Sequence, residues 1–180
     1  LLLLLAETGF RIGELLGVRY ATDIDYKRHL LYVNFRSDNE NEARAKNAEY
    51  RHAKISDATF EILGFYIEEY KDLIFQQEYL IINIAGDFAG KPMKDSGVYA
   101  LMERLEKKTG IKVTPHMLRH YFANARRKAG WNLELISQAL GHRNIETTMR
   151  YLNISDQELV DVSDEFYRNH PSLYGIDNLL

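Results

Sequence analysis

The chain has no cysteine, three prolines and one tryptophan in 180 residues, and these scarcities exclude whole classes of protein. Without cysteine there is no disulfide scaffold, no Cys-based zinc finger and no thiol nucleophile. Few prolines and no low-complexity stretch leave no candidate linker, so one domain of ordinary size is expected. An excess of basic residues is also missing, because 23 Lys and Arg face 26 Asp and Glu. Taken as a sum, the net charge of −3 argues against a nucleic acid partner.

Long hydrophobic runs are missing as well. The apolar run at residues 1–6 falls far short of the ~20 residues that cross a bilayer. No basic region precedes this run, so it does not resemble a signal peptide. We therefore expect no membrane partner and a cytoplasmic protein. The first residue is Leu rather than Met, which predicts a fragment whose N-terminal part lies outside this sequence.

The hydrophobic pattern and the capping residues predict an α+β protein that is mostly α-helical, with a small antiparallel β-sheet or hairpin. One helix is expected over residues 1–17, and strands are expected at His29–Phe35 and Tyr50–Ile55. The apolar run Tyr79–Ile84 fits either type of element. Further helices are predicted at residues 57–73, 95–109, 115–128, 132–140 and 145–151, and from Ser155 onward.

Charge is distributed unevenly along the chain. Residues 111–151 carry a net charge of +5, whereas residues 152–180 carry −5. A solvated helix face beside an acidic terminus would give this pattern, and so would a polyanion site beside a protein-binding tail. The distribution therefore permits a nucleic acid partner that the sum disfavours.

The predicted helix over 115–128 presents His116, Arg119 and His120 on one face, and His142 follows a helix-ending glycine. A zinc site, ordinary core residues and a phosphate site are the three interpretations. The zinc interpretation lacks a glutamate base after the first histidine and places an arginine beside the cation. A phosphate suits the cluster better, because the planar fork of arginine donors matches two phosphate oxygens.

Two other features are ambiguous by themselves. Glu14 follows Arg11 by three residues, which is the spacing of an ordinary helical ion pair. The predicted hairpin is basic, which fits either an exposed strand edge or a DNA groove; its bases are Arg44, Lys46, Arg51 and Lys54. Residues 128–151 could also form a helix-turn-helix, which would make the chain a DNA-binding module without enzymatic activity.

Together and in this order, these motifs resemble the catalytic domain of the tyrosine recombinases, the phage integrase family. The family pattern is an Arg box, a hairpin Lys, His-x-x-Arg-His, Leu-Gly-His, and a Tyr nine residues later. In residues 1–152 it falls on Arg11 with Glu14, Lys46, His116 with Arg119 and His120, His142, and Tyr151. Lys46 lies five residues before Arg51, as in the family, and Lys54 is its rival. The hairpin departs from the pattern, because it lacks the glycine or threonine after the lysine and the proline near its end.

The resemblance implies that Tyr151 attacks a DNA phosphodiester, forming a 3′-phosphotyrosyl link and releasing a 5′-hydroxyl. Arg11 and Arg119 would stabilise the charge on the phosphate, and Lys46 would protonate the leaving oxygen. Neither metal nor ATP nor another cofactor is implied, because the covalent link conserves the phosphodiester energy. The remaining roles are proton transfer by His116, a phosphate hydrogen bond from His142, and support by Glu14 and His120.

The resemblance also implies the partners and the setting. Residues 1–180 would be the catalytic domain, and we expect the family's separate N-terminal core-binding domain to be absent from this chain. The partner would be double-stranded DNA, bound by a homo-tetramer of an integrase or transposase from a bacterial or phage mobile genetic element. Residues 153–180 would pack either on a neighbouring protomer or on their own domain. We expect the activity to be site-specific DNA recombination and DNA integration.

Overall fold

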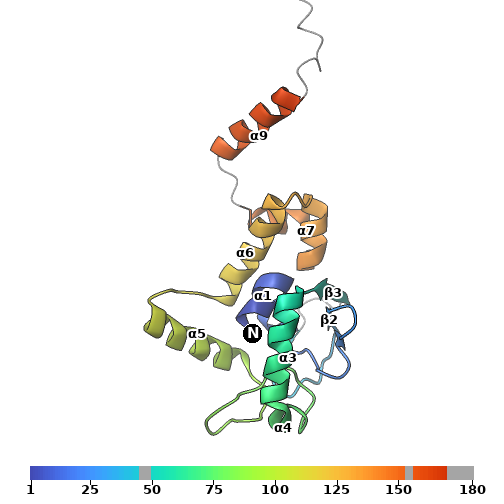
Figure 1. Ribbon diagram of the computed structural model, residues 1–180, viewed down its shortest axis with the longest axis vertical. Coiled ribbons are helices and arrows are strands. Elements are labelled where there is room, and N and C mark those ends of the chain that lie inside the picture. Colours follow the sequence, from blue (N-terminus) through green and yellow to red (C-terminus); the bar gives the residue numbers. More distant parts are fainter. Residues whose placement is uncertain (45–49, 153–155, 170–180) are drawn as a thin grey trace, which may run out of the picture.

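The computed structural model describes residues 1–44, 50–152 and 156–169. Within these ranges the chain is mostly helical with one small sheet, so the predicted α+β class is confirmed (Figure 1). The strands are β1 (Ile24–Asp25), β2 (Leu30–Val33) and β3 (Arg51–Lys54). The helices are α1 (Leu2–Thr8), α2 (Ile12–Leu16), α3 (Asp57–Glu69), α4 (Lys71–Ile74), α5 (Asp95–Thr109), α6 (Pro115–Lys128), α7 (Leu133–Leu140), α8 (Ile145–Met149) and α9 (Asp156–Asn169).

The single helix predicted over residues 1–17 is wrong, because a turn divides it into α1 and α2. Gly9 ends α1 with a φ of 63°, a left-handed conformation that favours glycine. A Cβ atom there would lie 2.6 Å from the Phe122 ring, so packing against α6 also requires glycine. The backbone of Arg11 is extended, with a φ of −70° and a ψ of 152°, and precedes α2. Arg11 therefore projects from a turn rather than from a helix face.

The sheet is antiparallel in the order β1-β2-β3. Leu30 pairs with Lys54, and Val33 pairs with Arg51, so both predicted strands exist but are shorter than expected. Strand β1 was not predicted, because two residues are too few to show an alternating pattern. The sheet lies beside α1 and α3 (Figure 1), and residues 45–49, which precede β3 in the sequence, lie outside the described ranges.

Other boundaries also moved. The helix predicted over residues 57–73 ends at Glu69, because Tyr70 leaves the helical conformation with a φ of −113° before the short α4. The ambiguous run Tyr79–Ile84 forms only isolated bridges to neighbouring segments. The predicted α5, α6 and α7 are confirmed, each within a residue at its ends. Ser155, the expected start of the last helix, lies outside the described residues.

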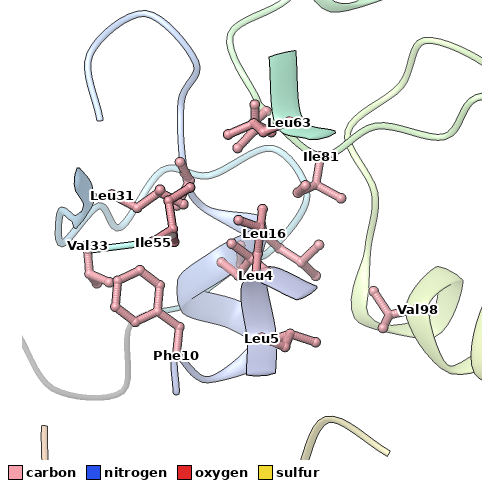
Figure 2. Packing of buried hydrophobic residues seen from close by; sticks show 14 of the residues in the cluster. Leu4, Leu5, Phe10, Leu16, Leu31, Val33, Ile55, Leu63, Ile81 and Val98 are labelled. Atoms are coloured by element: carbon pink, nitrogen blue, oxygen red, sulfur yellow. The ribbon is translucent and has the colours of Figure 1, made fainter. Parts of the chain in front are cut away.

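The core has two parts. The larger one joins α1, α2, the sheet, α3 and α5, and Figure 2 shows Phe10, Leu16 and Leu31 among its buried side chains. The smaller one joins α6 to α7 through Phe122, Ala123, Ile136 and Leu140, with Tyr151 and Leu152 packed against it. Helix α6 packs on both α1 and α7, and Arg119 of α6 links the α1–α2 turn to the C-terminal end of α7.

Helix α9 extends away from the rest of the molecule (Figure 1). A bidentate ion pair between Arg127 and Glu158 connects it to α6. In the portion of the chain that the structure describes, no helix is long and apolar enough to cross a membrane.

Candidate active site

Helix α6 positions three of the predicted site residues. Its start is fixed by the Thr114 hydroxyl, which accepts the Met117 N–H at 3.2 Å, and by a proline in the first turn. Spacings of three and four residues then place His116, Arg119 and His120 along one side of the helix. Arg119 points inward and is 4% exposed, whereas His116 is exposed.

Arg119 connects two turns that are distant in the sequence. Its Nη1 donates to the carbonyl of Gly9, and its Nη2 donates to the carbonyl of Leu140 at 2.6 Å. The same Nη2 lies 3.0 Å from Nε2 of His142. Burial, together with the positive charges of Arg11 and Arg51, lowers the pKa of Arg119 to about 10. The guanidinium therefore stays charged at neutral pH while facing the α7–α8 turn.

His142 follows Gly141, which ends α7 in a left-handed conformation with a φ of 63°. Its Nδ1 lies 2.8 Å from the hydroxyl oxygen of Thr148, a residue of α8. Burial, and then the charges of Arg119, Arg11 and Arg51, lower the pKa of His142 to about 4. At neutral pH the imidazole is therefore uncharged.

Tyr151 lies two residues after the end of α8, and its ring packs among the other predicted site residues. Its ring centroid is 4.2 Å from that of His120, with an angle of 28° between the two planes. The centroids of His116 and His142 lie 5.2 and 5.3 Å away, and the guanidinium carbon of Arg119 lies 5.9 Å away. The structure thus brings Tyr151, three histidines and a buried arginine together.

The backbone carbonyl of Tyr151 is held by α6. Asn124 donates to this carbonyl at 2.7 Å, and Nδ1 of His120 lies 3.3 Å from it. Nε2 of His120 lies 3.0 Å from Nε2 of His116. Sequence reasoning missed Asn124; its spacing of four residues from His120, on the same side of the helix, was the available signal.

Arg11 and Glu14 form the expected ion pair, with 3.0 Å between Arg11 Nη1 and Glu14 Oε1. The backbone N–H of Arg11 also donates to the Glu14 carboxylate at 2.6 Å. The Glu14 side chain is 3% exposed, whereas that of Arg11 is 26% exposed. Arg11 acts on Arg119 and His142 through its charge, since it lowers the pKa of both.

Arg51 contacts the candidate site, although the sequence analysis placed it only among the basic hairpin residues and used it to locate a lysine. It donates to the Glu14 carboxylate and to the carbonyl of Ala139, and its guanidinium lies 4.8 Å from the centroid of the Phe10 ring. It also packs on Gly141, where an added Cβ would lie 3.3 Å from its side chain. The position of Arg51 in the sequence gave no sign of this bridge, because Glu14 and Ala139 are distant from it in the sequence.

The structure describes one of the two candidate hairpin lysines, Lys54. Lys46 lies outside the described residues. Lys54 is exposed at the far end of β3, and its Nζ donates to the carbonyl of Arg28 at 2.8 Å. Lys54 is therefore engaged away from the cluster around Tyr151. Across residues 1–44, 50–152 and 156–169, no group of three His, Asp or Glu side chains is arranged to hold a metal ion.

The sequence and the fold of this chain are similar to those of known proteins. A transposase A of transposon Tn554 from Staphylococcus aureus is 33% identical over 168 residues, which cover 92% of this chain and 45% of that protein. A tyrosine recombinase XerA from Thermococcus onnurineus is 31% identical over 157 residues, covering 87% of this chain and 51% of that protein. The crystal structure of a XerA recombinase superposes with a TM-score of 0.70 at 28% identity, covering 93% of this chain and 54% of that chain.

The model of the phage integrase family matches residues 1–158. This chain belongs to the phage integrase family, and its fold is that of a tyrosine recombinase catalytic domain. The chain spans about half the length of the curated relatives that it matches.

Replacing Arg51 with methionine is expected to destabilise the fold. The change leaves the buried Glu14 carboxylate and the Ala139 carbonyl without one of their donors, so the free energy of unfolding should fall by about 3 kcal/mol. Urea unfolding of the purified protein measures this. Arg28→Met, at an exposed arginine, is the matched control and should change stability by no more than about 0.5 kcal/mol. Equal effects of both substitutions would contradict the buried bridge.

Stability should fall as the pH falls from about 6.5 to about 4. In this window the unfolded chain protonates His142 near its ordinary pKa of ~6.5, whereas the folded chain keeps it neutral down to about 4. The folded-state pKa of His116 is also lowered, by burial and then by His120 and Arg119, so it adds in the same direction. We expect a loss of about 2 kcal/mol from His142, measured by urea unfolding at several pH values. His142→Gln should flatten the slope; an unchanged slope would contradict a lowered pKa.

Proposed function

We propose that this chain is the catalytic part of a site-specific tyrosine recombinase, the integrase or transposase of a mobile genetic element, that cleaves and rejoins double-stranded DNA. The observation that carries the proposal is the packing of the Tyr151 ring against His120, 5.9 Å from the buried guanidinium of Arg119. A nucleophile packed beside a guanidinium group and imidazole rings suits attack on an anion.

The charge balance of the site favours an anionic substrate. The arginine cluster (Arg11, Arg51 and Arg119) presents three guanidinium groups, and Glu14 offsets one of their charges through its bonds to Arg11 and Arg51. Arginine presents donors in a fork that matches phosphate oxygens. Arg119 of this cluster lies 5.9 Å from the centroid of the Tyr151 ring, so a DNA phosphate drawn to the cluster would lie near the proposed nucleophile.

In the proposed reaction the Tyr151 oxygen attacks phosphorus, the P–O bond to the 5′-oxygen breaks, and a 3′-phosphotyrosyl link forms. Phenols are protonated at neutral pH, so the hydroxyl must pass its proton to a base. In this proposal His116 assists the proton transfer, and the 5.2 Å between its ring centroid and that of Tyr151 supports the role. Lys46 supplies a proton to the leaving 5′-oxygen. Attack by the 5′-hydroxyl of another strand reverses the steps and joins the exchanged partners.

The other residues stabilise the phosphate or hold the groups that do. Arg11 and Arg119 stabilise the negative charge that builds on the non-bridging oxygens, and His142 donates a hydrogen bond to the phosphate. Glu14 orients Arg11 through the 3.0 Å ion pair, and His120 supports Tyr151 by ring stacking. The reaction requires neither ATP nor metal, because the covalent link conserves the energy of the phosphodiester.

We further propose that the protein acts on DNA as a homo-tetramer, in the cytoplasm of a bacterium that carries the element. Helix α9 supports contact between protomers, because it extends from the body and exposes Val160, Val162, Phe166 and Tyr167. Removal of residues 155–180 should lower the number of protomers on DNA, measured by analytical ultracentrifugation. An unchanged number would show that this segment packs on its own domain.

A covalent capture experiment tests the proposed function. The protein is incubated in EDTA with a library of duplexes that have a randomised centre and a nick from which the cleaved strand diffuses away. We expect a protein–DNA adduct that survives denaturation. Binding without any adduct would favour a DNA-binding module without enzymatic activity, and an adduct that requires a divalent metal would contradict the metal-independent mechanism.

A further inference from the structure

Thr148 is a buried hydroxyl that the proposed mechanism does not use. Its side chain is 0% exposed, and its Oγ1 lies 2.8 Å from Nδ1 of His142. Its backbone carbonyl accepts the N–H of Tyr151 at 2.9 Å. One residue thus touches both the imidazole beside Arg119 and the backbone that carries the proposed nucleophile.

The hydrogen bonds define which nitrogen of His142 carries the proton. A guanidinium only donates, so Nε2 of His142, 3.0 Å from Arg119 Nη2, must accept. A neutral imidazole has one N–H, which must then lie on Nδ1 and donate to Oγ1 of Thr148. A pKa of about 4 keeps the ring neutral at pH 7, consistent with this single N–H.

A bound phosphate would require the opposite tautomer. Phosphate oxygens accept hydrogen bonds, so His142 can donate to one from Nε2 only if that nitrogen carries the proton. Nδ1 would then need a donor in place of an acceptor. A hydroxyl can donate or accept a hydrogen bond, whereas a carboxylate or a carbonyl can only accept one.

We infer that Thr148 is a positioning residue that lets His142 change tautomer, from a neutral acceptor facing Arg119 to a neutral donor facing the scissile phosphate. The inference rests on the proposed function. In the change, Nδ1 releases its proton to water and Nε2 takes one from water, so the ring stays neutral. The hydroxyl hydrogen of Thr148 rotates toward Nδ1, and no other group gains or loses a proton.

The test is the substitution Thr148→Val, which keeps the shape of the side chain and removes the hydroxyl. Thr148→Ser restores the hydroxyl, and Thr147→Val is the matched control at an exposed position on the same helix. The ¹⁵N chemical shifts of His142 report the tautomer in the DNA-free protein. We expect a protonated Nδ1 in the wild type, Thr148→Ser and Thr147→Val. In Thr148→Val we expect a mixture of the two tautomers, because Nδ1 loses its acceptor while Arg119 still favours an unprotonated Nε2.

Single-turnover adduct formation gives the second readout. Thr148→Val should slow cleavage by about 10- to 100-fold, as for loss of a group that orients a site residue. Thr148→Ser should recover most of the rate, and Thr147→Val should leave it unchanged. In the wild-type adduct, where the phosphate is bound, the ¹⁵N shifts should report a protonated Nε2.

Several results would overturn the inference. One is a wild-type protein in which Nε2 of His142 is protonated before DNA binds. Another is a Thr148→Val protein that keeps the wild-type tautomer and the wild-type cleavage rate. A Thr148→Ser protein as slow as Thr148→Val would show that the methyl group matters and not the hydroxyl. The tautomer is measured without DNA, so absence of an adduct from the wild type would count against the proposed function and leave this measurement intact.

Discussion

Replacing Tyr151 with phenylalanine is expected to remove the covalent adduct completely, a loss of at least about 10⁴-fold in cleavage rate. The phenol oxygen is the atom that bonds to phosphorus in the proposed reaction, and nothing else in the substituted side chain replaces it. Because the ring remains, its packing against His120 and on the smaller core should persist, so stability and DNA affinity should stay near those of the wild type. Denaturing gel electrophoresis measures the adduct.

Tyr121→Phe is the matched control for this prediction. Tyr121 lies on α6 and is 63% exposed, so loss of its hydroxyl should leave the adduct unchanged. An adduct formed by Tyr151→Phe, or one lost equally in both variants, would contradict Tyr151 as the nucleophile. Peptide mapping of the wild-type adduct would then identify the residue that carries the DNA.

Replacing Arg119 or Arg11 with methionine should slow cleavage by about 10²- to 10³-fold in each case, because each change removes a charge-assisted donor to the phosphate. The effects on stability should differ. Arg119 is buried and donates to the carbonyls of Gly9 and Leu140, so its loss should lower the free energy of unfolding by about 3 kcal/mol. Arg11 is 26% exposed, and its loss should cost about 1 kcal/mol.

Single-turnover cleavage and urea unfolding of the same protein samples separate the two effects. Arg36→Met is the control, since it removes a guanidinium from the buried carboxylate of Asp23 outside the arginine cluster. It should lower stability and leave the cleavage rate of the folded protein unchanged. Equal stability of the Arg119 and Arg11 variants, or a rate loss in Arg36→Met as large as theirs, would contradict the assigned roles.

Much of the site could be predicted because its signals are local in the sequence. The hydroxyl cap and proline before α6 define where that helix begins, and spacings of three and four residues then place His116, Arg119 and His120 on one side. The glycine before His142 marks the end of α7 in the same way. These features depend on backbone preferences over a few residues, so they can be read without the fold.

The residues that were missed make contacts between distant segments. Arg51 donates hydrogen bonds to Glu14, which is 37 residues away, and to Ala139, which is 88 residues away. Asn124 reaches a carbonyl 27 residues away. No periodicity or cap relates such positions, because they meet only when α6, α7 and β3 pack together. The same reason explains the break between α1 and α2, since the Phe122 ring against Gly9 comes from another helix.

The sequence by itself determined the class of fold, the family and the order of the motifs, and it resolved the misleading net charge of −3 into a basic block and an acidic tail. Only the tertiary structure decided that Arg119 is buried between two turns and that Glu14 is shared by Arg11 and Arg51. The contact between the Thr148 hydroxyl and Nδ1 of His142 also became visible only in the tertiary structure. Local preferences determine elements and caps, whereas burial and the pKa of a group depend on which distant segments surround it.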